Sequence, residues 1–472
     1  MFHGRERELN ELNRLYRENR FQLFVLYGRR RVGKTALLKE FCKDKPTVFY
    51  SAEISNDKLN LEKFSAQVLR HYGETGLRSF SAWENALEFI HERQKDAPLV
   101  LVFDEFPYLA EKNRAFLSML QHMIDHRLQS GKIFLVLCGS YVGFMERDVL
   151  GAKSPLFGRR TAQLRLKPFD YPESRAFLSG FSPEEQCMFY GALGGIPLYL
   201  GKVDGKKTFR DNLVDLFLRP TSSLYEEPIF LLREELQQPG VYNAVIEAIA
   251  SGASKANEIA GKTGETAAKC LKYIHVLSEL GIVSKETPFG EKESSRKTIY
   301  NATDFLFRFW YRYVAPNRTL IENDAWQIVW EKKIAPDYSN HMGAVFEQIC
   351  REYLLHQNSR GKLPFLFTSI GRWWGSDPKT KTQTKIDLIA SDGTEYLICE
   401  CKWRNEKMKR NVLAELRAKA EIFLPAEKKP WLALFSKSGF TDAVRQEAKT
   451  YGNVLLFTLD DMISGEEYYF GH

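Results

Sequence analysis

One octapeptide constrains this chain more than any other part of its sequence. Residues 28–35 read Gly-Arg-Arg-Arg-Val-Gly-Lys-Thr and fit the pattern G-x-x-x-x-G-K-[ST]. An apolar run, 22–27, precedes the motif, and a segment of helical period, 36–41, follows it. Glycines let such a loop curl until its N–H groups and the helix N-terminus face phosphate groups. The sequence therefore predicts a nucleotide phosphate site between a buried strand and a helix.

The side chains of this loop suit a nucleoside triphosphate with a divalent cation. Lys34 is expected to reach the β- and γ-phosphate oxygens, and Thr35 is expected to ligate Mg²⁺. The residues expected to bind ATP are Gly28, Arg29, Arg30, Arg31, Val32, Gly33, Lys34 and Thr35. ATP and Mg²⁺ are therefore the expected cofactors.

Polar residues end two further apolar runs. The run 99–103 leads into Asp104 and Glu105, at the carboxyl end of a predicted buried strand. Asp104 is expected to complete the Mg²⁺ shell, and Glu105 is expected to polarise the water that attacks the γ-phosphate. The run 133–137 ends near Ser140, whose hydroxyl is expected beside the γ-phosphate.

The distribution of apolar residues predicts an α/β chain of several domains. Short apolar runs alternate with helical segments up to about residue 166, which is typical of a parallel sheet covered on both faces. We expect a P-loop NTPase core over 1–170, a helical lid over 171–236, a winged helix over 237–316 and a further α/β domain over 325–472.

The segment 237–316 reads as helix, glycine turn, helix and hairpin, and its second helix would be the recognition helix. We expect Leu271, Ile274, Leu277 and Leu280 on one face of that helix. Lys262, Lys269 and Lys272 can meet DNA phosphates, but nearby glutamates nearly cancel their charge. The sequence is therefore compatible both with a segment that binds DNA and with one that docks onto a protein.

The last segment carries acids and a lysine in a suggestive order. Strand side chains alternate, so Glu400 and Lys402 share a face, with Asp387 across a hairpin and Glu347 on the preceding helix. This order is similar to that of the PD-(D/E)xK nucleases. The resemblance implies an α/β restriction-endonuclease-like fold for 325–472, acids that bind Mg²⁺ and a lysine that steadies water or phosphate. The sequence is compatible both with an active nuclease and with a nuclease-derived domain that only binds. Trp373 and Trp374 are expected in the core rather than stacked on bases.

The order of the motifs resembles that of archaeal-type ATPases of the AAA+/STAND group. The resemblance rests on residues 4–6, the loop 28–35, the acids 104–105, Gly139-Ser140, the segment 155–160 and Gly194-Gly195-Ile196-Pro197. It implies that Glu105 is the catalytic base, that Ser140 is sensor 1 and that Pro197 packs near the adenine. Arg159 and Arg160 stand where such ATPases present an arginine finger to a neighbouring subunit, which implies a homo-oligomer. A pair of solvated arginines is the alternative.

Charge and cysteine usage limit the partners and the cell compartment that we expect for this protein. The 67 Lys and Arg against 60 Asp and Glu give a net charge of +7, which permits nucleic-acid contact without requiring it. The charged N-terminus lacks the apolar stretch of a secretory signal, and no apolar run approaches the roughly 20 residues of a membrane span. Seven cysteines without a CxxC pair argue against disulfides and structural zinc. We expect a cytoplasmic protein.

These features predict an Mg²⁺-dependent ATPase that couples ATP hydrolysis to a winged helix and a nuclease-like domain and acts on DNA. A signalling or assembly switch that binds protein partners, with an inactive C-terminal domain, is the first alternative. A nucleotide sensor with negligible turnover is the second.

Overall fold

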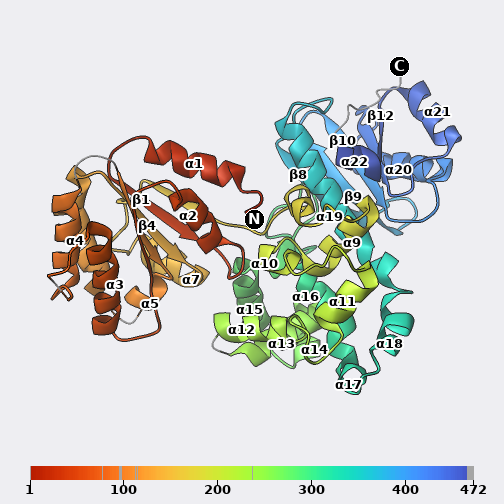
Figure 1. The fold of residues 1–472 in the computed structure, drawn as a ribbon. Coiled ribbons are helices and arrows are strands. Elements are labelled where there is room, and N and C mark those ends of the chain that lie inside the picture. The colour runs from red at the N-terminus through yellow and green to blue at the C-terminus, as the bar shows by residue number, and fades with distance from the viewer. Residues whose placement is uncertain are drawn as a thin grey trace. The chain divides into compact units, whose positions relative to one another are not determined.

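The computed structural model describes residues 2–464 apart from 77, 95–97, 112, 114 and 237. The chain divides into two compact units, Met1–Pro168 with Ile196–Leu198, and Phe169–Gly195 with Tyr199–His472. Each unit has its own five-stranded sheet (Figure 1). The end of the expected last domain, 465–472, lies outside the described residues.

A five-stranded parallel sheet forms the centre of the first unit. Its spatial order is β2-β3-β4-β1-β5, so β4 separates the strand before the phosphate loop from the strand that carries the two acids. Strands β1, β3 and β4 are buried along their whole length, which explains their unbroken apolar runs. The strands are β1 (Gln22–Tyr27), β2 (Thr47–Ser51), β3 (Leu99–Asp104), β4 (Ile133–Gly139) and β5 (Ala162–Arg165).

Helices cover both faces of this sheet (Figure 1). On one face, aromatic contacts join Tyr16 and Phe41 to Phe134 of β4. On the other face, an apolar cluster combines the strands with α3, α4 and α6. The helices are α1 (Glu6–Tyr16), α2 (Lys34–Cys42), α3 (Asp57–Tyr72), α4 (Trp83–Arg93), α5 (Pro107–Ala110), α6 (Ala115–His126) and α7 (Val142–Phe144). The prediction of an α/β core with a parallel sheet is confirmed.

The second unit begins with helices only. Capping boxes start α8 at Asp170 and α9 at Ser182, where a side chain and a glutamate three residues later satisfy the first N–H groups. These helices are α8 (Tyr171–Ser174), α9 (Pro183–Leu193), α11 (Phe209–Phe217) and α12 (Glu227–Glu235). They occupy the segment expected to be a lid. The short helix α10 (Pro197–Leu200) begins with residues that belong to the first unit.

Three helices and a hairpin follow. The helices are α13 (Pro239–Ala250), α14 (Ala256–Thr263) and α15 (Ala267–Glu279), and the antiparallel strands are β6 (Val283–Glu286) and β7 (Ile299–Ala302). Gly264 ends α14 with a φ of 72°, a left-handed value that glycine adopts without strain. The short helices α16 (Phe305–Phe309), α17 (Arg318–Glu322) and α18 (Trp326–Val329) lead to the long helix α19 (Tyr338–Ser359).

A mixed five-stranded sheet ends the second unit, in the order β12-β11-β10-β9-β8. Strand β9 runs antiparallel to β8 and β10, whereas β10, β11 and β12 are parallel. The strands are β8 (Ser369–Ser376), β9 (Gln383–Ser391), β10 (Tyr396–Lys402), β11 (Trp431–Ser436) and β12 (Val454–Thr458). Helix α19 packs on one face through Phe346 and Tyr353, and α20 (Arg410–Phe423) and α21 (Asp442–Tyr451) pack on the other. Helix α22 (Leu459–Ser464) follows β12.

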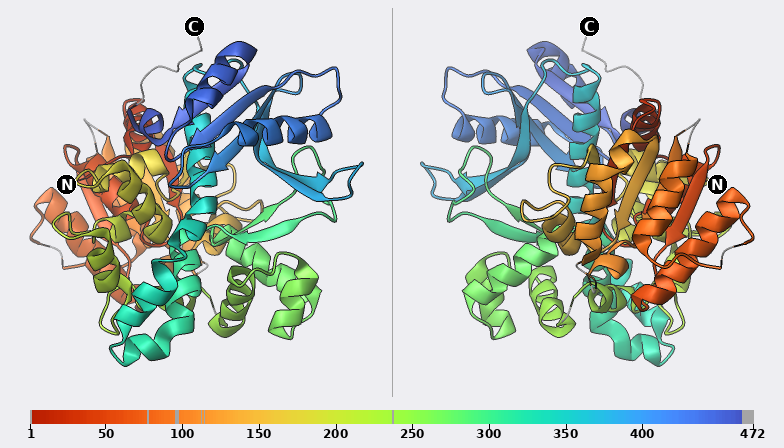
Figure 2. Two further views of the ribbon diagram at one scale, coloured as in Figure 1. Left: turned by 90° about the vertical axis from the view of Figure 1, so that its right-hand side faces the viewer. Right: turned by 90° about the vertical axis from the view of Figure 1, so that its left-hand side faces the viewer.

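The β6–β7 hairpin lies against the edge strand β8 (Figure 2). The Phe289 N–H donates to the Arg372 carbonyl at 2.7 Å, and the Trp374 indole N–H donates to the Lys297 carbonyl at 3.1 Å. Trp373 packs against Phe423 of α20, with ring centroids 5.5 Å apart. The two tryptophans therefore make structural contacts within the unit.

Helix α19 also packs closely along α9. A Cβ atom added at Gly191 would come within 2.7 Å of the Met342 sulfur, so the two helices lie close together at this glycine. His341 Nε2 lies 2.8 Å from the Gly191 carbonyl oxygen, and the Tyr338 hydroxyl donates to the Met188 carbonyl at 2.6 Å. The expected lid segment and the final α/β domain are thus joined by one helix.

Further along α19, the Glu352 carboxylate is enclosed between elements. It accepts hydrogen bonds from the Tyr171 N–H at 2.8 Å, the Tyr190 hydroxyl at 3.1 Å and the Gln348 amide at 2.8 Å. Burial raises the pKa of Glu352 to about 7. One turn later, His356 Nε2 lies 2.7 Å from an Asp170 carboxylate oxygen. A titratable group therefore stands inside the α8–α9–α19 packing.

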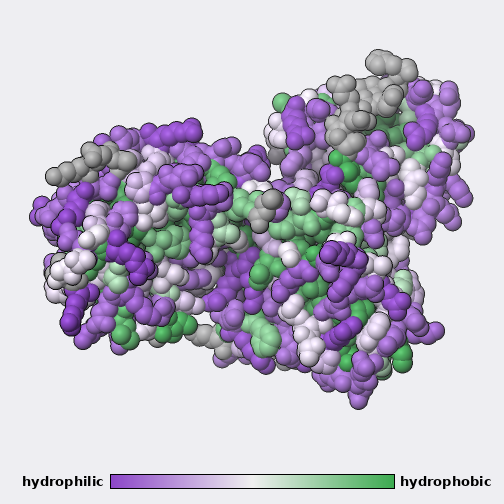
Figure 3. Space-filling model, viewed as in Figure 1, coloured by the Kyte–Doolittle hydropathy of each residue, from purple (hydrophilic) through white to green (hydrophobic). Residues whose placement is uncertain are grey.

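Hydrophilic residues cover most of the face drawn in Figure 3, and apolar residues gather there only in small groups. Among the described residues, no helix combines the length and the apolar character needed to cross a membrane.

Candidate functional site

The phosphate loop follows β1 and leads directly into α2. Gly28 has a φ of 151°, and a Cβ atom there would lie 2.4 Å from the Leu166 carbonyl oxygen, so the first glycine is required by space. Gly33 has a φ of 92° at the start of α2. Lys34 is buried, and its ammonium donates to the carbonyls of Gly28 at 2.8 Å and Arg29 at 3.1 Å. The lysine is thus held over the loop by the loop's own backbone.

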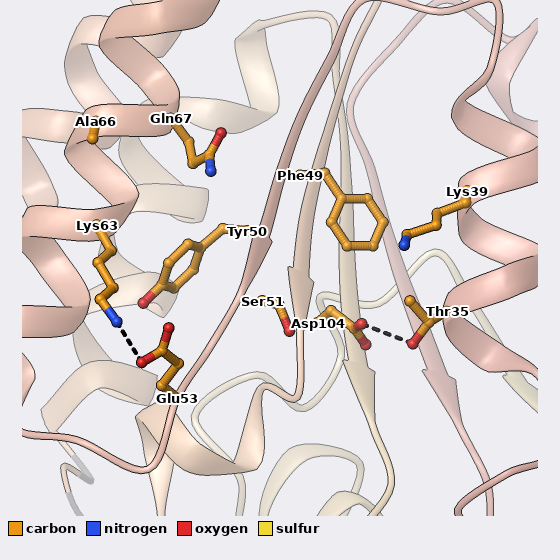
Figure 4. Close-up of a pocket in the computed structure, with 10 residues that line it drawn as sticks. All are labelled: Thr35, Lys39, Phe49, Tyr50, Ser51, Glu53, Lys63, Ala66, Gln67 and Asp104. Atoms are coloured by element: carbon orange, nitrogen blue, oxygen red, sulfur yellow. Dashed lines mark hydrogen bonds and ion pairs between the residues drawn. The ribbon is translucent and has the colours of Figure 1, made fainter.

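The two residues expected to hold Mg²⁺ meet. The Thr35 hydroxyl donates to an Asp104 carboxylate oxygen at 2.8 Å, and Asp104 is buried. Both side chains line a pocket of about 460 Å³ together with Lys39 and residues of β2 and α3 (Figure 4). Hydroxyl and carboxylate oxygens are the ligands that Mg²⁺ prefers. The hydroxyl of Thr35 and the carboxylate of Asp104 therefore fit a Mg²⁺ ion.

Glu105 and Ser140 also meet, from the ends of neighbouring strands. The Ser140 hydroxyl donates to a Glu105 carboxylate oxygen at 2.7 Å. Glu105 has a φ of 50°, uncommon for a residue other than glycine, and the next N–H, of Phe106, donates to the Cys138 carbonyl at 2.8 Å. The turn after β3 is therefore tied to β4 by its backbone and by the Glu105 side chain.

Two arginines, one outside the loop and one within it, connect the loop to its surroundings. The buried Arg5 guanidinium donates to the Val32 carbonyl at 3.2 Å and the Lys167 carbonyl at 2.6 Å. The Arg30 guanidinium donates to the Tyr108 hydroxyl at 2.7 Å, which links the loop to the turn that carries Glu105. Pro197 lies beside the second glycine, since its Cγ would be 3.6 Å from a Cβ atom at Gly33.

Arg159 and Arg160 make contacts within the first unit. Arg159 forms a two-point ion pair with Asp125, with both N–O distances 2.7 Å, and also donates to the Pro155 carbonyl at 2.9 Å. The hydrogen bond from Arg159 holds the pKa of Asp125 below its usual range. Arg160 donates to the Leu150 carbonyl at 3.1 Å. Arg159 is thus the more firmly held of the two.

The four apolar residues expected on one face of the helix α15 differ in their burial. Ile274, Leu277 and Leu280 are buried, whereas the Leu271 side chain is 42% exposed. Among the lysines expected to meet DNA phosphates, Lys262 donates to the Ser251 carbonyl at 3.0 Å, Lys269 pairs with Glu265 at 3.0 Å, and Lys272 is exposed.

The acids of the C-terminal domain come together as a charged network. Lys402 hydrogen-bonds Glu400, and its ammonium is 4.0 Å from an Asp387 carboxylate oxygen. Glu347 of α19 lies near Asp387, and burial together with that carboxylate raises the pKa of Glu347. Over the part of the chain that the structure describes, no three His, Cys, Asp or Glu side chains gather closely enough to hold a metal ion. In this arrangement the residues do not fit the metal site that the nuclease resemblance implies.

Comparison with known proteins agrees with the loop geometry. Residues 2–203 match the model of an ATPase domain found predominantly in Archaea. The protein MJECL04 of Methanocaldococcus jannaschii is 32% identical over 465 residues, which cover 98% of this chain and all of the relative. The chain belongs to the family of this archaeal protein. It is a P-loop ATPase, as the sequence predicted.

Other similarities cover less of the chain or show only a distant likeness. Residues 310–413 match a family of archaeal and bacterial proteins of unknown function. The ATP-binding protein MJ0423 of M. jannaschii is 53% identical over 45 residues, 10% of this chain and 76% of the relative. The Walker-type ATPase PABY2304 of Pyrococcus abyssi is 20% identical, with a TM-score of 0.47, over 66% of this chain and 96% of that one.

Several contacts at the two sites lie outside the phosphate-binding pattern and the acid motif, although Arg5 belongs to the 4–6 motif. Arg5 and Tyr108 contact the loop or its arginine, but neither belongs to the phosphate-binding pattern. Lys385 lies two residues before Asp387, so strand alternation alone points to it. Lys419 of α20 meets Glu400, and no local pattern in the sequence indicates that contact.

Proposed function

We propose that the loop site hydrolyses ATP, with Lys34, Thr35, Asp104, Glu105 and Ser140 in the roles that their types suggest. The observation that carries this proposal is the pair of hydrogen bonds that join Thr35 to Asp104 and Ser140 to Glu105 at the ends of β3 and β4. Asp104, the proposed cation ligand, and Glu105, the proposed water-activating carboxylate, are thus adjacent in the chain. Lys34 of the loop belongs to the same unit.

In this proposal each side chain has one task. Lys34 exchanges its loop carbonyl partners for phosphate oxygens, and the loop N–H groups hold the β-phosphate. Thr35 and Asp104 hold Mg²⁺, which, when bound, neutralises charge on the phosphates. Glu105 orients the attacking water and accepts its proton, while Ser140 fixes the carboxylate. Pro197, next to Gly33, is proposed to pack near the adenine.

Two substitutions are expected to affect ATP binding and ATP hydrolysis separately. Lys34→Ala should abolish ATP binding because it removes contacts made before the reaction, whereas Glu105→Gln should keep binding and stop hydrolysis. ATP affinity by calorimetry and phosphate release measure the two effects, and Glu111→Gln, an exposed glutamate nearby, is the matched control. Unchanged ATP affinity in Lys34→Ala, or normal turnover in Glu105→Gln, would contradict the proposed roles.

We also propose that the ATPase acts as a homo-oligomer in which Arg159 or Arg160 reaches the γ-phosphate of a neighbour. Arg160 is the better placed, since Arg159 would have to break its two-point pair with Asp125. Arg160→Ala should then lower turnover and leave ATP affinity unchanged. Turnover per chain that does not change with protein concentration across the assembly range would contradict this role.

For the second unit we propose that α13, α14, α15 and the β6–β7 hairpin form a winged helix that binds duplex DNA. The order of three helices and an antiparallel hairpin supports this proposal, with α15 as the recognition helix. Exposed Lys272 on α15 is available to contact phosphate.

Protein docking, the main alternative, is favoured by particular contacts. The hairpin is hydrogen-bonded to β8, and Lys262 and Lys269 already contact residues of this chain. Leu271, an exposed apolar residue on α15, is suited to contact with a protein. ATP hydrolysis stimulated by duplex DNA, with retardation of the duplex at low salt, would support the DNA proposal. No stimulation and no retardation would support the docking of a protein partner.

We propose that the final domain is related to the PD-(D/E)xK nucleases and contacts the same nucleic acid. The convergence of Asp387, Glu400 and Lys402, with Glu347 from α19, supports this relationship. Cleavage of duplex or single-stranded DNA with Mg²⁺ or Mn²⁺, lost in Asp387→Asn, would identify an active nuclease. Binding without cleavage would identify a nuclease-derived binding domain.

A further inference from the structure

The hairpin of β8 and β9 extends beyond the rest of the C-terminal sheet. Strand β10 pairs with β9 over 388–391, whereas β8 pairs with β9 as far out as Ser376 and Gln383. The outer part of the hairpin, 373–386, is therefore a ribbon of two strands, and Figure 2 shows its end projecting from the sheet. Residues 376–383 form the ribbon tip.

The inner part of the ribbon is fixed to the domain by contacts on both of its faces. Ile386 is buried, and Trp373, directly opposite on β8, packs against Phe423 of α20. Neighbouring residues of a strand point to opposite faces. The indole N–H of Trp374 accordingly reaches another partner, the Lys297 carbonyl, at 3.1 Å. The tip is thus presented from a firmly packed base.

The chain reverses at the ribbon tip in a turn that its own side chains build. The Asp377 carboxylate accepts hydrogen bonds from the Lys379 N–H and the Thr380 hydroxyl, both at 2.8 Å. The Lys381 N–H donates to the Asp377 carbonyl at 2.9 Å. The hydrogen bond from the Lys379 N–H holds the pKa of Asp377 below its usual range. The one acid of the tip therefore shapes the turn.

The ribbon tip carries a basic excess that faces water. Its sequence, Ser-Asp-Pro-Lys-Thr-Lys-Thr-Gln, holds two lysines and one acid, and each of its residues except Asp377 is exposed. Within the described residues, neither Lys379 nor Lys381 forms an ion pair. The neighbouring loop 287–298 carries three cations and two acids, so it does not cancel this charge.

Helix α15, the proposed recognition helix, offers less free positive charge. Of its two lysines, Lys269 is paired with Glu265 at 3.0 Å, and only Lys272 is left to meet a phosphate. The helix also exposes an apolar side chain, that of Leu271. A phosphate backbone is therefore better matched by the ribbon tip than by α15.

The residue types of the tip select among charged partners. Lysine, serine, threonine and glutamine are side chains that contact DNA phosphates. A protein interface needs a buried apolar or aromatic centre, which the tip sequence lacks. Single-stranded nucleic acid is held by stacking on aromatic rings, and the nearest aromatic residue, Trp374, is fixed at the base of the ribbon. Duplex DNA fits the tip best.

We propose that the ribbon tip binds duplex DNA by entering the major groove. That groove is about 12 Å wide and admits a two-stranded ribbon. Lys379 and Lys381 contact phosphates at the rim of the groove. Ser376 and Gln383, opposite each other on the two strands and joined by a hydrogen bond of 2.8 Å, face the base edges. This inference rests on the proposed DNA-binding function and names the surface that performs it.

The test is binding of a labelled duplex to the full chain, followed by fluorescence anisotropy over a range of salt concentrations. Combining Lys379→Gln with Lys381→Gln should weaken binding by at least about tenfold at about 0.1 M salt and lower the slope of log K against log salt by about 1.8, because each phosphate contact contributes about 0.9. Lys332→Gln with Lys333→Gln, an exposed pair outside the ribbon, removes the same charge and should leave both quantities unchanged.

A second measurement tests the groove. Dimethyl sulfate methylates guanine N7, which lies in the major groove. The wild type should protect guanines of the bound duplex, and the ribbon variant should lose that protection. Thermal unfolding checks that both double variants fold, which is expected because all four substituted side chains are exposed.

The outcomes separate this inference from the function on which it rests. Wild-type affinity and salt slope in the ribbon variant, together with weaker binding by Lys272→Glu, would overturn the role of the ribbon and leave α15 as the DNA contact. Equal losses in the ribbon variant and the control pair, or guanines that stay reactive in the wild-type complex, would also overturn it. Failure of the wild type to bind duplex at low salt would overturn the proposed DNA function as well.

Discussion

Replacing Glu352 by glutamine should change how the stability of the second unit depends on pH. The carboxylate is enclosed by Tyr171, Tyr190 and Gln348, and burial raises its pKa from 4.5 to about 7. Between these two pH values the folded chain holds a proton that the unfolded chain has lost. The contribution of Glu352 to stability is therefore present below pH 4.5 and is lost as the pH rises to 7.

The size of the effect follows from the pKa change. A difference of this size corresponds to about 3 kcal/mol, all of it lost above pH 7 in the wild type. Glutamine carries no charge and keeps an oxygen for the Tyr171 N–H, but its NH₂ group faces the donors of Tyr190 and Gln348, a cost of about 1 kcal/mol. At pH 8 the Glu352→Gln variant should therefore be more stable than the wild type by about 2 kcal/mol, or about 4 °C in Tm.

Thermal unfolding of both proteins from pH 5 to pH 8 is the assay. The wild type should lose stability relative to Glu352→Gln across this range, and Glu421→Gln, an exposed glutamate on α20, should follow the wild type. Parallel curves for the wild type and Glu352→Gln would refute the reasoning, because they would mean that Glu352 titrates alike in the folded and unfolded chain.

Three further substitutions test the two proposed sites. Ser140→Ala removes the hydrogen bond to Glu105 and should lower turnover roughly 10- to 100-fold at unchanged ATP affinity, measured by steady-state kinetics and calorimetry; equal turnover would exclude a positioning role. Gly28→Ala places a Cβ 2.4 Å from the Leu166 carbonyl and should cost at least about tenfold in ATP affinity, so unchanged nucleotide titration would contradict the loop geometry. Lys272→Glu should weaken duplex binding and flatten its salt dependence in retardation assays, whereas an unaltered salt slope would remove Lys272 from the interface.

The sequence predicts the nucleotide site well because its signals are local. Strands buried on both faces must be apolar along their length, so β1, β3 and β4 stand out as runs. Polar residues at their carboxyl ends then meet at one edge of the sheet. The pairing of Thr35 with Asp104 follows from this arrangement once the strands are known to be parallel.

The exposure of Leu271 has a geometric cause. Residues three apart on a helix are rotated by about 60° from each other, so a series spaced by three turns steadily around the axis. Leu271 therefore lies about half a turn from Leu280, and one narrow contact cannot bury both.

Contacts that depend on how distant elements pack are not predictable from one sequence. Arg5 binds the carbonyls of Val32 and Lys167, and Lys419 of α20 pairs with Glu400 of β10. No spacing rule relates these residues, because the contacts arise only after helices and sheets are placed. For the same reason the acids and Lys402 are recognisable from the sequence, whereas the contact of Lys419 with Glu400 is not.

The docking of the β6–β7 hairpin also affects the solubility of the chain. Strand β8 is an edge of the C-terminal sheet, and an uncovered edge presents free N–H and C=O groups that pair with other chains. The hydrogen bonds from Phe289 to Arg372 and from Trp374 to Lys297 place the hairpin along that edge. A chain shortened within 287–298 would therefore expose β8, and we expect it to aggregate through this strand even if its ATP site were intact.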